Sequence, residues 1–430
     1  MINKKSISNK KFEIAVIGLG YVGLPLAIEF SKKYKVIGFD IKQKRIQELS
    51  DSFDVTSEVS TRKLKLAKYL KYTDNVNEIK DCTIYIIAIP TPINSQNKPN
   101  LKPLKNASKL IGKVLKKNDI VIYESTVFPG ATEEICVPIL ERNSGLKYNK
   151  EFFCGYSPER INPGDKKHKI TSIKKVTSGS NKQTAIKVDK LYRNIITAGT
   201  HLAPSIKVAE AAKIIENTQR DVNIALINEF TKIFNKLKID TNSVLEAAET
   251  KWNFLSFKPG LVGGHCIGVD PYYLAHKAKQ IGLNPKMIIS GRETNDSMSS
   301  FVVKRVIEAM SKKSIRSKNA NILIMGLTFK ENCPDIRNTK IIDLIRGFEN
   351  LHMKVDVYDP LANKDEVFEE YKLRLIDHPI RNKYDTILIA VNHNKFRQMQ
   401  FNNLLKFCKK KNVIYDLKNT FPKSHAVIKL

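Results

Sequence analysis

Short apolar runs alternate with helical patterns over the first half of the chain. Between Phe12 and about Ala198, six runs predict strands, several of them apolar throughout: EIAVIG, KVIGFD, TIYIIAIP, DIVIYEST, EFFCGYSP and KKVTSGS. Strands without a polar face, alternating with helices, are typical of a parallel sheet that helices cover on both faces. This half of the chain is therefore expected to form an α/β domain.

One long helical pattern follows. From Ser205 to about Leu237, apolar residues recur three and four positions apart, with no glycine or proline inside. A helix of some thirty residues spans about 45 Å at about 1.5 Å per residue, which is more than one small domain can cover. A shorter helical stretch, DTNSVLEAAET, comes next.

A second α/β pattern begins after the polar segment SKKSIRSK. NILIMGLTFK restarts a strand, turn and helix, and KVDVYDP, DTILIAVNH and NVIYDLKN continue the strands. The pattern divides the chain into residues 1–200, 201–312 and 313–430. The last part echoes the first, but without a complete set of motif glycines, so a different ligand is expected there.

A glycine motif indicates which ligand the first domain binds. AVIGLGYVGLPLA places Gly18, Gly20 and Gly23 in GxGxxG spacing, after a predicted strand and at the start of a predicted helix. The glycines permit a tight turn, the approach of a pyrophosphate to the backbone, and close packing of helix on strand. Asp40 ends the next strand, where a carboxylate binds ribose hydroxyls and repels a 2′-phosphate, so NAD is favoured over NADP. Arg45 could argue for NADP, but its place in the following helix suits stacking on adenine.

The fold class is therefore α/β, with a Rossmann domain, a long helix and a second, related α/β domain along the chain. The formal charge is +30. No basic stripe carries interleaved aromatic residues and no nucleic-acid-binding signature is present, so we expect a solvated lysine-rich surface and no nucleic-acid partner. Anionic small ligands are the second interpretation of the charge.

The compartment follows from the cysteines and the apolar runs. Six widely spaced cysteines without a CxxC pair fit reduced thiols better than disulfides or a metal site. The apolar run near the N-terminus contains the motif glycines and lacks a small-residue cleavage site, unlike a signal peptide. No stretch reaches the ~20 apolar residues that span a bilayer. We expect a cytoplasmic protein with no membrane partner and no metal.

The segment GGHCIGVD contains the candidate for the chemistry, Cys266. A thiolate can attack an aldehyde to give a hemithioacetal that loses hydride to NAD⁺, and the resulting thioester can be hydrolysed. Gly263 and Gly264 would let the backbone close around such an adduct, and Asp270 could position or activate a water. On this segment alone, a small buried hydrophobic cysteine is the alternative.

Seven segments, in this order, resemble the nucleotide-sugar 6-dehydrogenases, a family that includes UDP-glucose and GDP-mannose dehydrogenases: IGLGYVGLPLA, AIPTP, ESTVFPGAT, SPERINPG, EAAKIIENTQRDVNIALINE, GGHCIGVDPYYL and GLTFKENCPDIRNTK. The resemblance covers nearly the whole chain. It implies oxidation of a sugar CH₂OH to a carboxylate with two NAD⁺ and one water. It also implies two Rossmann-like doubly wound domains joined by a long central helix, and a homodimer with that helix in its core.

The resemblance also implies roles for single residues. Cys266 is the nucleophile, and Asp270 binds water during the alcohol step. Lys213 and Asn217 lie four residues apart on one helix face, where an ammonium and an amide can stabilise a developing oxyanion. Glu159 handles water during thioester hydrolysis.

Binding residues follow from the same resemblance. Thr126 lies near the reacting carbon and the nicotinamide, and Lys330 meets the nucleotide. Arg337 reaches the NAD pyrophosphate, which suits a bidentate guanidinium. The other implied residues are Tyr21, Val22 and Thr91 for the cofactor, and Arg160, Lys258, Gly263 and His265 for the UDP-sugar, together with Glu159, Lys213 and Asn217.

The choice of sugar depends on two positions. His265 and Arg160 depart from the UDP-glucose branch, which favours serine and an apolar residue there. ERINPGDKKHKI and ISGRETNDSM resemble enzymes that oxidise UDP-N-acetylglucosamine or UDP-N-acetylgalactosamine for surface polysaccharides such as Vi-type, O-antigen or capsule chains. UDP-N-acetylmannosamine and UDP-glucose are the alternatives. A catalytically silent NAD-binding regulator and a polyanion-binding protein are the rival classes of function.

Overall fold

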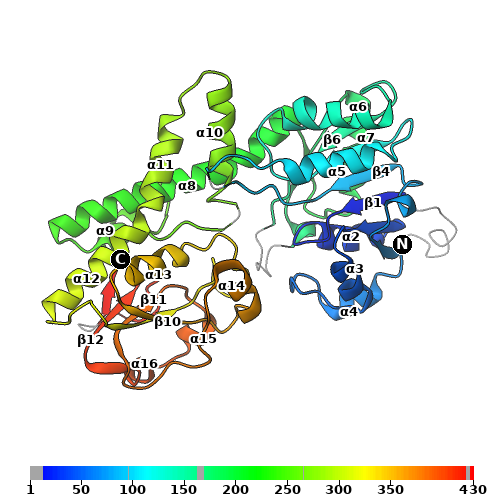
Figure 1. Cartoon of the computed structure of the whole chain (residues 1–430). Helices are drawn as coiled ribbons and strands as arrows, with labels where there is room; N and C mark the ends of the chain where they lie inside the picture. Colours follow the sequence, from blue (N-terminus) through cyan, green and yellow to red (C-terminus); the bar gives the residue numbers. More distant parts are fainter. Residues whose placement is uncertain (1–12, 95, 162–168, 265, 423–426) are drawn as a thin grey trace. The chain divides into compact units, whose positions relative to one another are not determined.

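The computed structural model describes residues 13–94, 96–161, 169–264, 266–422 and 427–430 (Figure 1). Contacts divide the chain into two compact units, residues 1–216 with 272–283, and residues 217–271 with 284–430. The three-domain division expected from the sequence stays a prediction. None of the described helices is long and apolar enough to cross a membrane.

An eight-stranded sheet forms the first unit. Its strands are β1 (Ile14–Ile17), β2 (Val36–Phe39), β3 (Leu70–Thr73), β4 (Ile84–Ile87), β5 (Ile120–Tyr123), β6 (Phe153–Tyr156), β7 (Lys175–Gly179) and β8 (Thr200–Leu202). They lie in the order β3-β2-β1-β4-β5-β6-β7-β8. The first six follow the Rossmann order, in which the winding reverses between β1 and β4 and a ligand binds beyond the carboxyl ends of the strands.

Helices cover this sheet and account for its apolar strands. They are α2 (Gly23–Ser31), α3 (Gln43–Ser50), α4 (Thr61–Leu66), α5 (Lys102–Gly112), α6 (Val137–Ser144) and α7 (Lys182–Arg193). All four residues of β1 are buried, and Leu24, Leu26 and Phe30 of α2 lie in the same core. The predicted α/β domain with its covered sheet is confirmed.

The direction of one strand differs from the sequence expectation. A wholly parallel sheet was expected, but β7 runs antiparallel to β6, with Gly155 opposite Gly179 and Tyr156 opposite Ser178. A parallel neighbour needs a crossover connection, usually a helix. The described part of the β6–β7 connection contains only the 3₁₀ turn Ile170–Ser172, whereas α7 connects β7 to its parallel neighbour β8.

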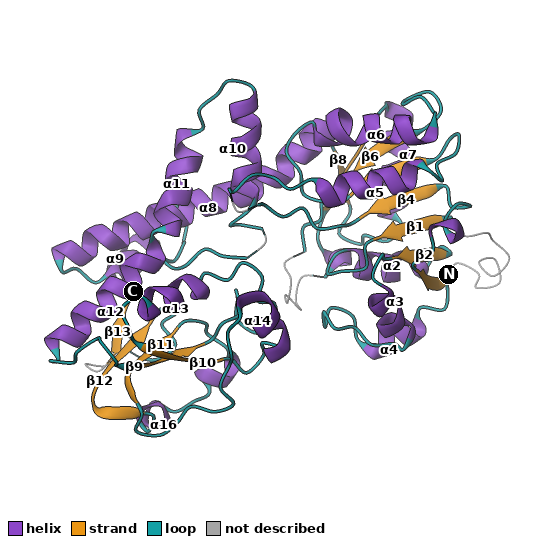
Figure 2. Ribbon diagram, in the orientation of Figure 1, coloured by secondary structure: helices purple, strands orange, loops and turns teal. Residues whose placement is uncertain are grey.

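The second sheet has five parallel strands: β9 (Asn321–Met325), β10 (Lys354–Tyr358), β11 (Tyr384–Ile389), β12 (Cys408–Asp416) and β13 (Val427–Lys429). Their order, β10-β9-β11-β12-β13, is the other common doubly wound order (Figure 2). The helices of this part are α13 (Ile341–Glu349), α14 (Lys364–Tyr371), α15 (Asn394–Arg397) and α16 (Phe401–Leu405).

The predicted echo of the glycine turn is present in this sheet. Gly326 N donates to Tyr358 O at 2.8 Å, as Gly18 N donates to Phe39 O at 2.8 Å after β1. Asp359 then accepts from the turn, as Asp40 does in the first sheet. The helix after the second turn begins only at Ile341, later than the pattern predicted, so a long loop stands where the first domain has its helix start.

The long helix is α8 (Ile206–Leu237), coloured green in Figure 1, and it begins one residue after the predicted start. It is followed by α9 (Thr241–Glu249), α10 (Asp270–Gln280), α11 (Lys286–Asp296) and α12 (Met298–Lys312). Asp240 caps α9 by accepting from Ser243 N at 2.9 Å. The α/β class with two doubly wound sheets and a long helix between them in the chain is confirmed.

Candidate active site

Glycine is needed at the three motif positions for different structural reasons. Gly18 has φ +91°, and a Cβ there would lie 2.7 Å from Ala88 O. A Cβ on Gly23 would lie 1.8 Å from Gly18 O. At Gly20 a Cβ would meet nothing within 4 Å. The fold itself requires the first and third glycines, whereas the open space at Gly20 fits a pyrophosphate lying against the backbone.

Two side chains hold the glycine turn from β2 and α3. Asp40 accepts from Leu19 N at 2.9 Å through Oδ2 and from Lys42 N at 3.0 Å through Oδ1. A carboxylate has about four lone-pair sites, so Asp40 can still accept from ribose hydroxyls. Arg45 is buried; its Nε donates to Leu19 O at 2.9 Å and its Nη2 to Asp54 Oδ1 at 2.7 Å. Arg45 therefore braces the turn, and its stacking on adenine stays a prediction.

The loops after β4 and β5 meet beside this turn. Thr91 Oγ1 donates to Thr126 O at 2.7 Å, and Tyr273 OH on α10 donates to Thr91 O at 2.9 Å. Tyr21 and Val22 lie half-buried between the glycine turn and α2. Since the residues of the glycine turn, Thr91 and Thr126 follow the carboxyl ends of neighbouring strands, the structure brings these predicted cofactor residues to one edge of the sheet.

Glu159 is a fixed carboxylate in the loop after β6. Its Oε1 accepts from the backbone N–H groups of Arg160 and Ile161, both at 2.6 Å, and its Oε2 accepts from Lys175 Nζ at 3.1 Å. Three donors leave about one of its lone-pair sites for a water. The sequence analysis missed Lys175, because one lysine at the start of a predicted strand does not differ from the many other lysines of this chain.

Arg160 connects this loop to α8. Its Nη1 donates to Lys174 O at 2.8 Å, and its Nη2 lies 2.8 Å from Glu216 Oε1. Lys213 lies one helical turn before Glu216, is only 7 % exposed, and forms no hydrogen bond or ion pair with any described residue. Its role in stabilising a developing oxyanion stays a prediction.

The thiol lies in a turn that leads into α10. Cys266 O accepts from Asp270 N at 2.8 Å, and the Asp270 side chain, 2 % exposed, accepts from Asn217 Nδ2 on α8 at 2.5 Å. Five of the six free cysteines are buried, and Cys266 is the half-buried one. The structure therefore places Cys266 and Asp270 in one turn and ties that turn to Asn217 of α8. His265 lies outside the described residues.

The glycines before the thiol pack against the second sheet's long loop. A Cβ on Gly263 would lie 2.6 Å from Asn338 O, and one on Gly264, which has φ +85°, would lie 2.8 Å from Phe329 Cδ2. Gly264 N donates to Asn338 O at 3.0 Å. These close approaches explain both glycines, whereas closure of the backbone around an adduct stays a prediction.

With this geometry in place, three parts of the chain match one family in order. Residues 12–196 match the NAD binding domain of the UDP-glucose/GDP-mannose dehydrogenase family, residues 207–297 its central domain, and residues 323–423 its UDP binding domain. The chain belongs to this family. It is an NAD-dependent nucleotide-sugar dehydrogenase, as the sequence resemblance predicted.

Relatives of this dehydrogenase are similar over nearly their full length. The UDP-N-acetyl-D-glucosamine 6-dehydrogenase of Pseudomonas aeruginosa is 56 % identical over 98 % of this chain and 100 % of its own. The protein of the same name from Salmonella typhi is 54 % identical over 97 % and 98 %. A solved UDP-D-ManNAc dehydrogenase from Pyrococcus horikoshii superposes with a TM-score of 0.88, at 30 % identity, over 97 % of this chain and 98 % of that one.

The dehydrogenase has a basic pocket beside the second sheet. Lys330 lines it together with Gly263, Lys340 and Lys418. The sequence analysis missed Lys418, whose pKa is lowered by burial. Its position just beyond the carboxyl end of a predicted strand was the available signal. Glu331 also lines the pocket, and Lys340 is paired with Asp296 and Asp343, so the contact of Lys330 with the nucleotide stays a prediction.

Two predicted binding residues of the dehydrogenase have protein partners instead. Arg337 forms a bidentate pair with Asp335, with Nε–Oδ1 at 2.9 Å and Nη2–Oδ2 at 2.6 Å. Lys258 Nζ lies 2.6 Å from Glu249 Oε1 and is exposed. Their contacts with pyrophosphate and sugar stay predictions. Among the described residues, no group of three or more His, Cys, Asp or Glu side chains could hold a metal ion.

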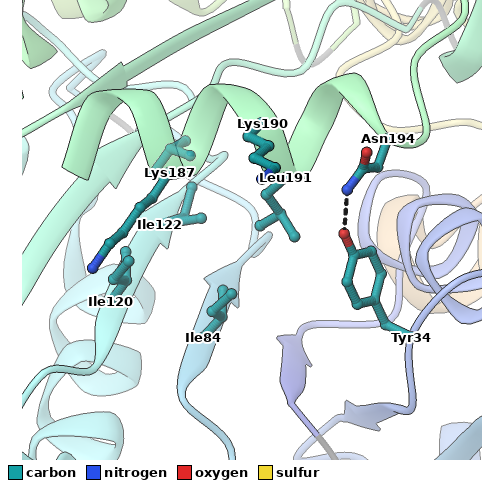
Figure 3. A pocket seen from close by; sticks show the side chains of 9 residues that line it. Tyr34, Ile84, Ile120, Ile122, Lys187, Lys190, Leu191 and Asn194 are labelled. Atoms are coloured by element: carbon teal, nitrogen blue, oxygen red, sulfur yellow. Dashed lines mark hydrogen bonds between the residues drawn. The ribbon is translucent and has the colours of Figure 1, made fainter. Parts of the chain in front are cut away.

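A separate apolar pocket of about 280 Å³ lies at the other edge of the first sheet (Figure 3). Ile84 and Ile120, the first residues of β4 and β5, line it together with Leu191 of α7. At its end Asn194 Nδ2 donates to Tyr34 OH. Because the glycine turn follows the carboxyl end of β1, this pocket is not part of the active site.

Proposed function

We propose that this dehydrogenase oxidises C6 of a UDP-N-acetylhexosamine, UDP-N-acetylglucosamine first, to the uronic acid for surface-polysaccharide biosynthesis. The observation that carries the chemistry is the half-buried thiol of Cys266, in a turn that ends at the Asn217–Asp270 hydrogen bond. Two relatives that are 56 % and 54 % identical are named UDP-N-acetyl-D-glucosamine 6-dehydrogenases, whereas a relative named UDP-N-acetyl-D-mannosamine dehydrogenase is 32 % identical. The higher identities support N-acetylglucosamine over N-acetylmannosamine. UDP-N-acetylgalactosamine, which differs at C4, is the second candidate.

NAD⁺ bound at the glycine turn of the first sheet would supply the hydride acceptor for both oxidations of C6. In the proposed reaction, the Cys266 thiolate adds to the C6 aldehyde, and the resulting hemithioacetal loses its C6 hydride to become a thioester. Lys213 and Asn217 donate to the oxygen on C6 while it carries negative charge. Asp270 holds the Asn217 amide and a water that takes the hydroxyl proton in the alcohol step. Glu159 accepts a proton from the water that hydrolyses the thioester.

The test counts NADH per sugar consumed for UDP-N-acetylglucosamine, UDP-N-acetylgalactosamine, UDP-N-acetylmannosamine and UDP-glucose. Two NADH and a uronate are expected. Cys266→Ser should lower turnover by roughly 10³-fold or more, because the thiol forms the covalent intermediate. Cys408→Ser is the matched control, since burial raises the pKa of that thiol to about 11. One NADH with a released aldehyde, or full activity in Cys266→Ser, would contradict the proposal.

We also propose that two chains associate through α8. Five apolar residues within this helix are between 45 and 61 % exposed: Val208, Ile215, Leu226, Ile233 and Leu237. At about 100° per residue, their spacing places all five within about 20° of one line along the helix. An apolar stripe of this length on a soluble chain favours a protein partner, and a second copy presents the same stripe.

We propose the cytoplasm as the compartment. All six cysteines are free thiols and five of them are buried. Free thiols of this kind fit a reducing compartment, where NAD and nucleotide sugars are also available to the enzyme.

A further inference from the structure

Three ionisable side chains meet inside the first unit. Lys175, the first residue of β7, places its Nζ 2.5 Å from Glu124 Oε2 and 3.1 Å from Glu159 Oε2. Glu124 directly follows β5, and Glu159 lies in the loop after β6. All three are buried. One ammonium therefore links a carboxylate inside the sheet to the carboxylate that the proposed reaction uses.

The Lys175 ammonium also lies 5.6 Å from the centroid of the Tyr192 ring. Burial alone would lower the pKa of Lys175, but the charges and hydrogen bonds of Glu124 and Glu159 outweigh it and raise that pKa. Lys175 is therefore a cation held between two carboxyl groups. A buried lysine at the start of a strand costs free energy that an apolar residue would not, which indicates that its contact with Glu159 is used.

Glu124 holds the Lys175 ammonium through one carboxylate oxygen, while its other oxygen is held by Tyr192. Its Oε1 accepts from Tyr192 OH of α7, and its Oε2 accepts from Lys175. Burial raises the pKa of Glu124 to about 7, against the opposing charge of Lys175. With Tyr192 on one oxygen and Lys175 on the other, Glu124 keeps the ammonium from turning away from Glu159.

We infer that Lys175 is a positioning residue for the acid-forming step: it fixes Glu159, and Glu124 fixes Lys175. This inference rests on the proposed function. In the step, the water oxygen bonds to the thioester carbon and gives one proton to Glu159. The C–S bond breaks with its electron pair on the Cys266 sulfur, and Glu159 then releases the proton. Lys175 holds one carboxylate oxygen while the backbone holds the other, so that the remaining lone pair points in one direction.

The experiment compares Lys175→Met with Lys175→Arg and with the surface control Lys187→Met, whose side chain is exposed on α7. Rapid mixing with NAD⁺ and UDP-N-acetylglucosamine follows NADH, and intact-protein mass spectrometry follows the covalent adduct. Lys175→Met should keep the NADH burst of the first turnover. Its steady-state rate should fall by about 10²-fold, as expected for a misplaced catalytic group, and thioester should accumulate. Lys175→Arg should recover part of the rate, and Lys187→Met all of it.

A second readout separates positioning from general damage. In Lys175→Met the loss should fall on the steady-state kcat, whereas the rate of the NADH burst should not change, because both oxidations precede the hydrolysis that Glu159 serves. If Lys175→Met does not fold, Glu124→Gln provides the same test, with a smaller accumulation of thioester expected.

Four outcomes decide the matter. Accumulated thioester with a retained burst supports the inference. A steady-state rate equal to wild type overturns it, and so does loss of the burst in a variant that melts normally, because Lys175 would then act before hydrolysis. If wild-type protein forms no NADH from any of the UDP-sugars, the proposed function fails, which differs from a failure confined to the Lys175 variants.

Discussion

Glu210 is a completely buried carboxylate near the start of α8. Its Oε2 accepts from Gly130 N at 2.5 Å and its Oε1 from Thr132 N at 2.9 Å. Burial raises the pKa of Glu210 to about 7, although these hydrogen bonds oppose the shift. Glu210 thus ties the long helix to the loop that follows Thr126, and its protonation is linked to folding.

This link predicts a pH dependence of stability. A glutamate titrates near 4.5 when it is not perturbed, so the folded protein binds the Glu210 proton more tightly than the unfolded chain. The resulting stabilisation is complete below about pH 4.5 and is lost as the pH rises through about 7. Glu210→Gln cannot titrate, so its free energy of unfolding should fall less than that of wild type between those values. Urea unfolding across this range measures both slopes.

The slope decides this prediction, because glutamine also loses one of the two side-chain oxygens that accept from backbone N–H groups, which lowers stability at every pH. Glu229→Gln, an exposed position on the same helix, is the control and should keep the wild-type slope. Equal slopes in Glu210→Gln and wild type would contradict the assignment.

At the scale of the element, two glycine substitutions in the β1–turn–α2 unit should have different effects, one on folding and the other on NAD binding. Gly23→Ala should prevent or severely impair folding, because its Cβ would lie 1.8 Å from the backbone oxygen of Gly18. Gly20→Ala should fold with a nearly unchanged melting temperature, because no atom lies within 4 Å of its Cβ. A methyl group there would occupy pyrophosphate space, so NAD affinity should fall about tenfold or more. Calorimetric titration with NAD⁺ and thermal unfolding measure the two effects; tight NAD binding by Gly20→Ala would show that the phosphates lie elsewhere.

Elements with a local signal were predictable from the sequence. The glycine turn, Asp40 at the end of β2 and the long helix all lie where the pattern placed them, because spacing and periodicity are properties of neighbouring residues. The direction of β7 was not predictable in this way, because it depends on whether a crossover helix precedes the strand. The Lys175–Glu124 contact joins residues 51 positions apart, so no local pattern could indicate it.

At the scale of the whole molecule, the site residues are spread over the entire sequence. Gly18 and Lys418 are separated by most of the chain, and each lies at the carboxyl end of a parallel strand in its own sheet. The resemblance, which covered nearly every segment, therefore carried more information about function than any one motif. The positive charge carried less, since scattered lysines are compatible with many soluble proteins.

Association of two chains is the last prediction at this scale. In a two-fold symmetric contact each substitution appears twice, so a glutamate at Leu226 and at Ile233 would bury four charges in the apolar stripe on α8. Leu226→Glu/Ile233→Glu should therefore lower the mass measured by light scattering from that of two chains to the 48.9 kDa of one. Leu66→Glu, an exposed apolar position on α4, should leave the dimer intact. A dimer that survives the double substitution would place the contact on another surface, and a monomeric wild type would contradict the association itself.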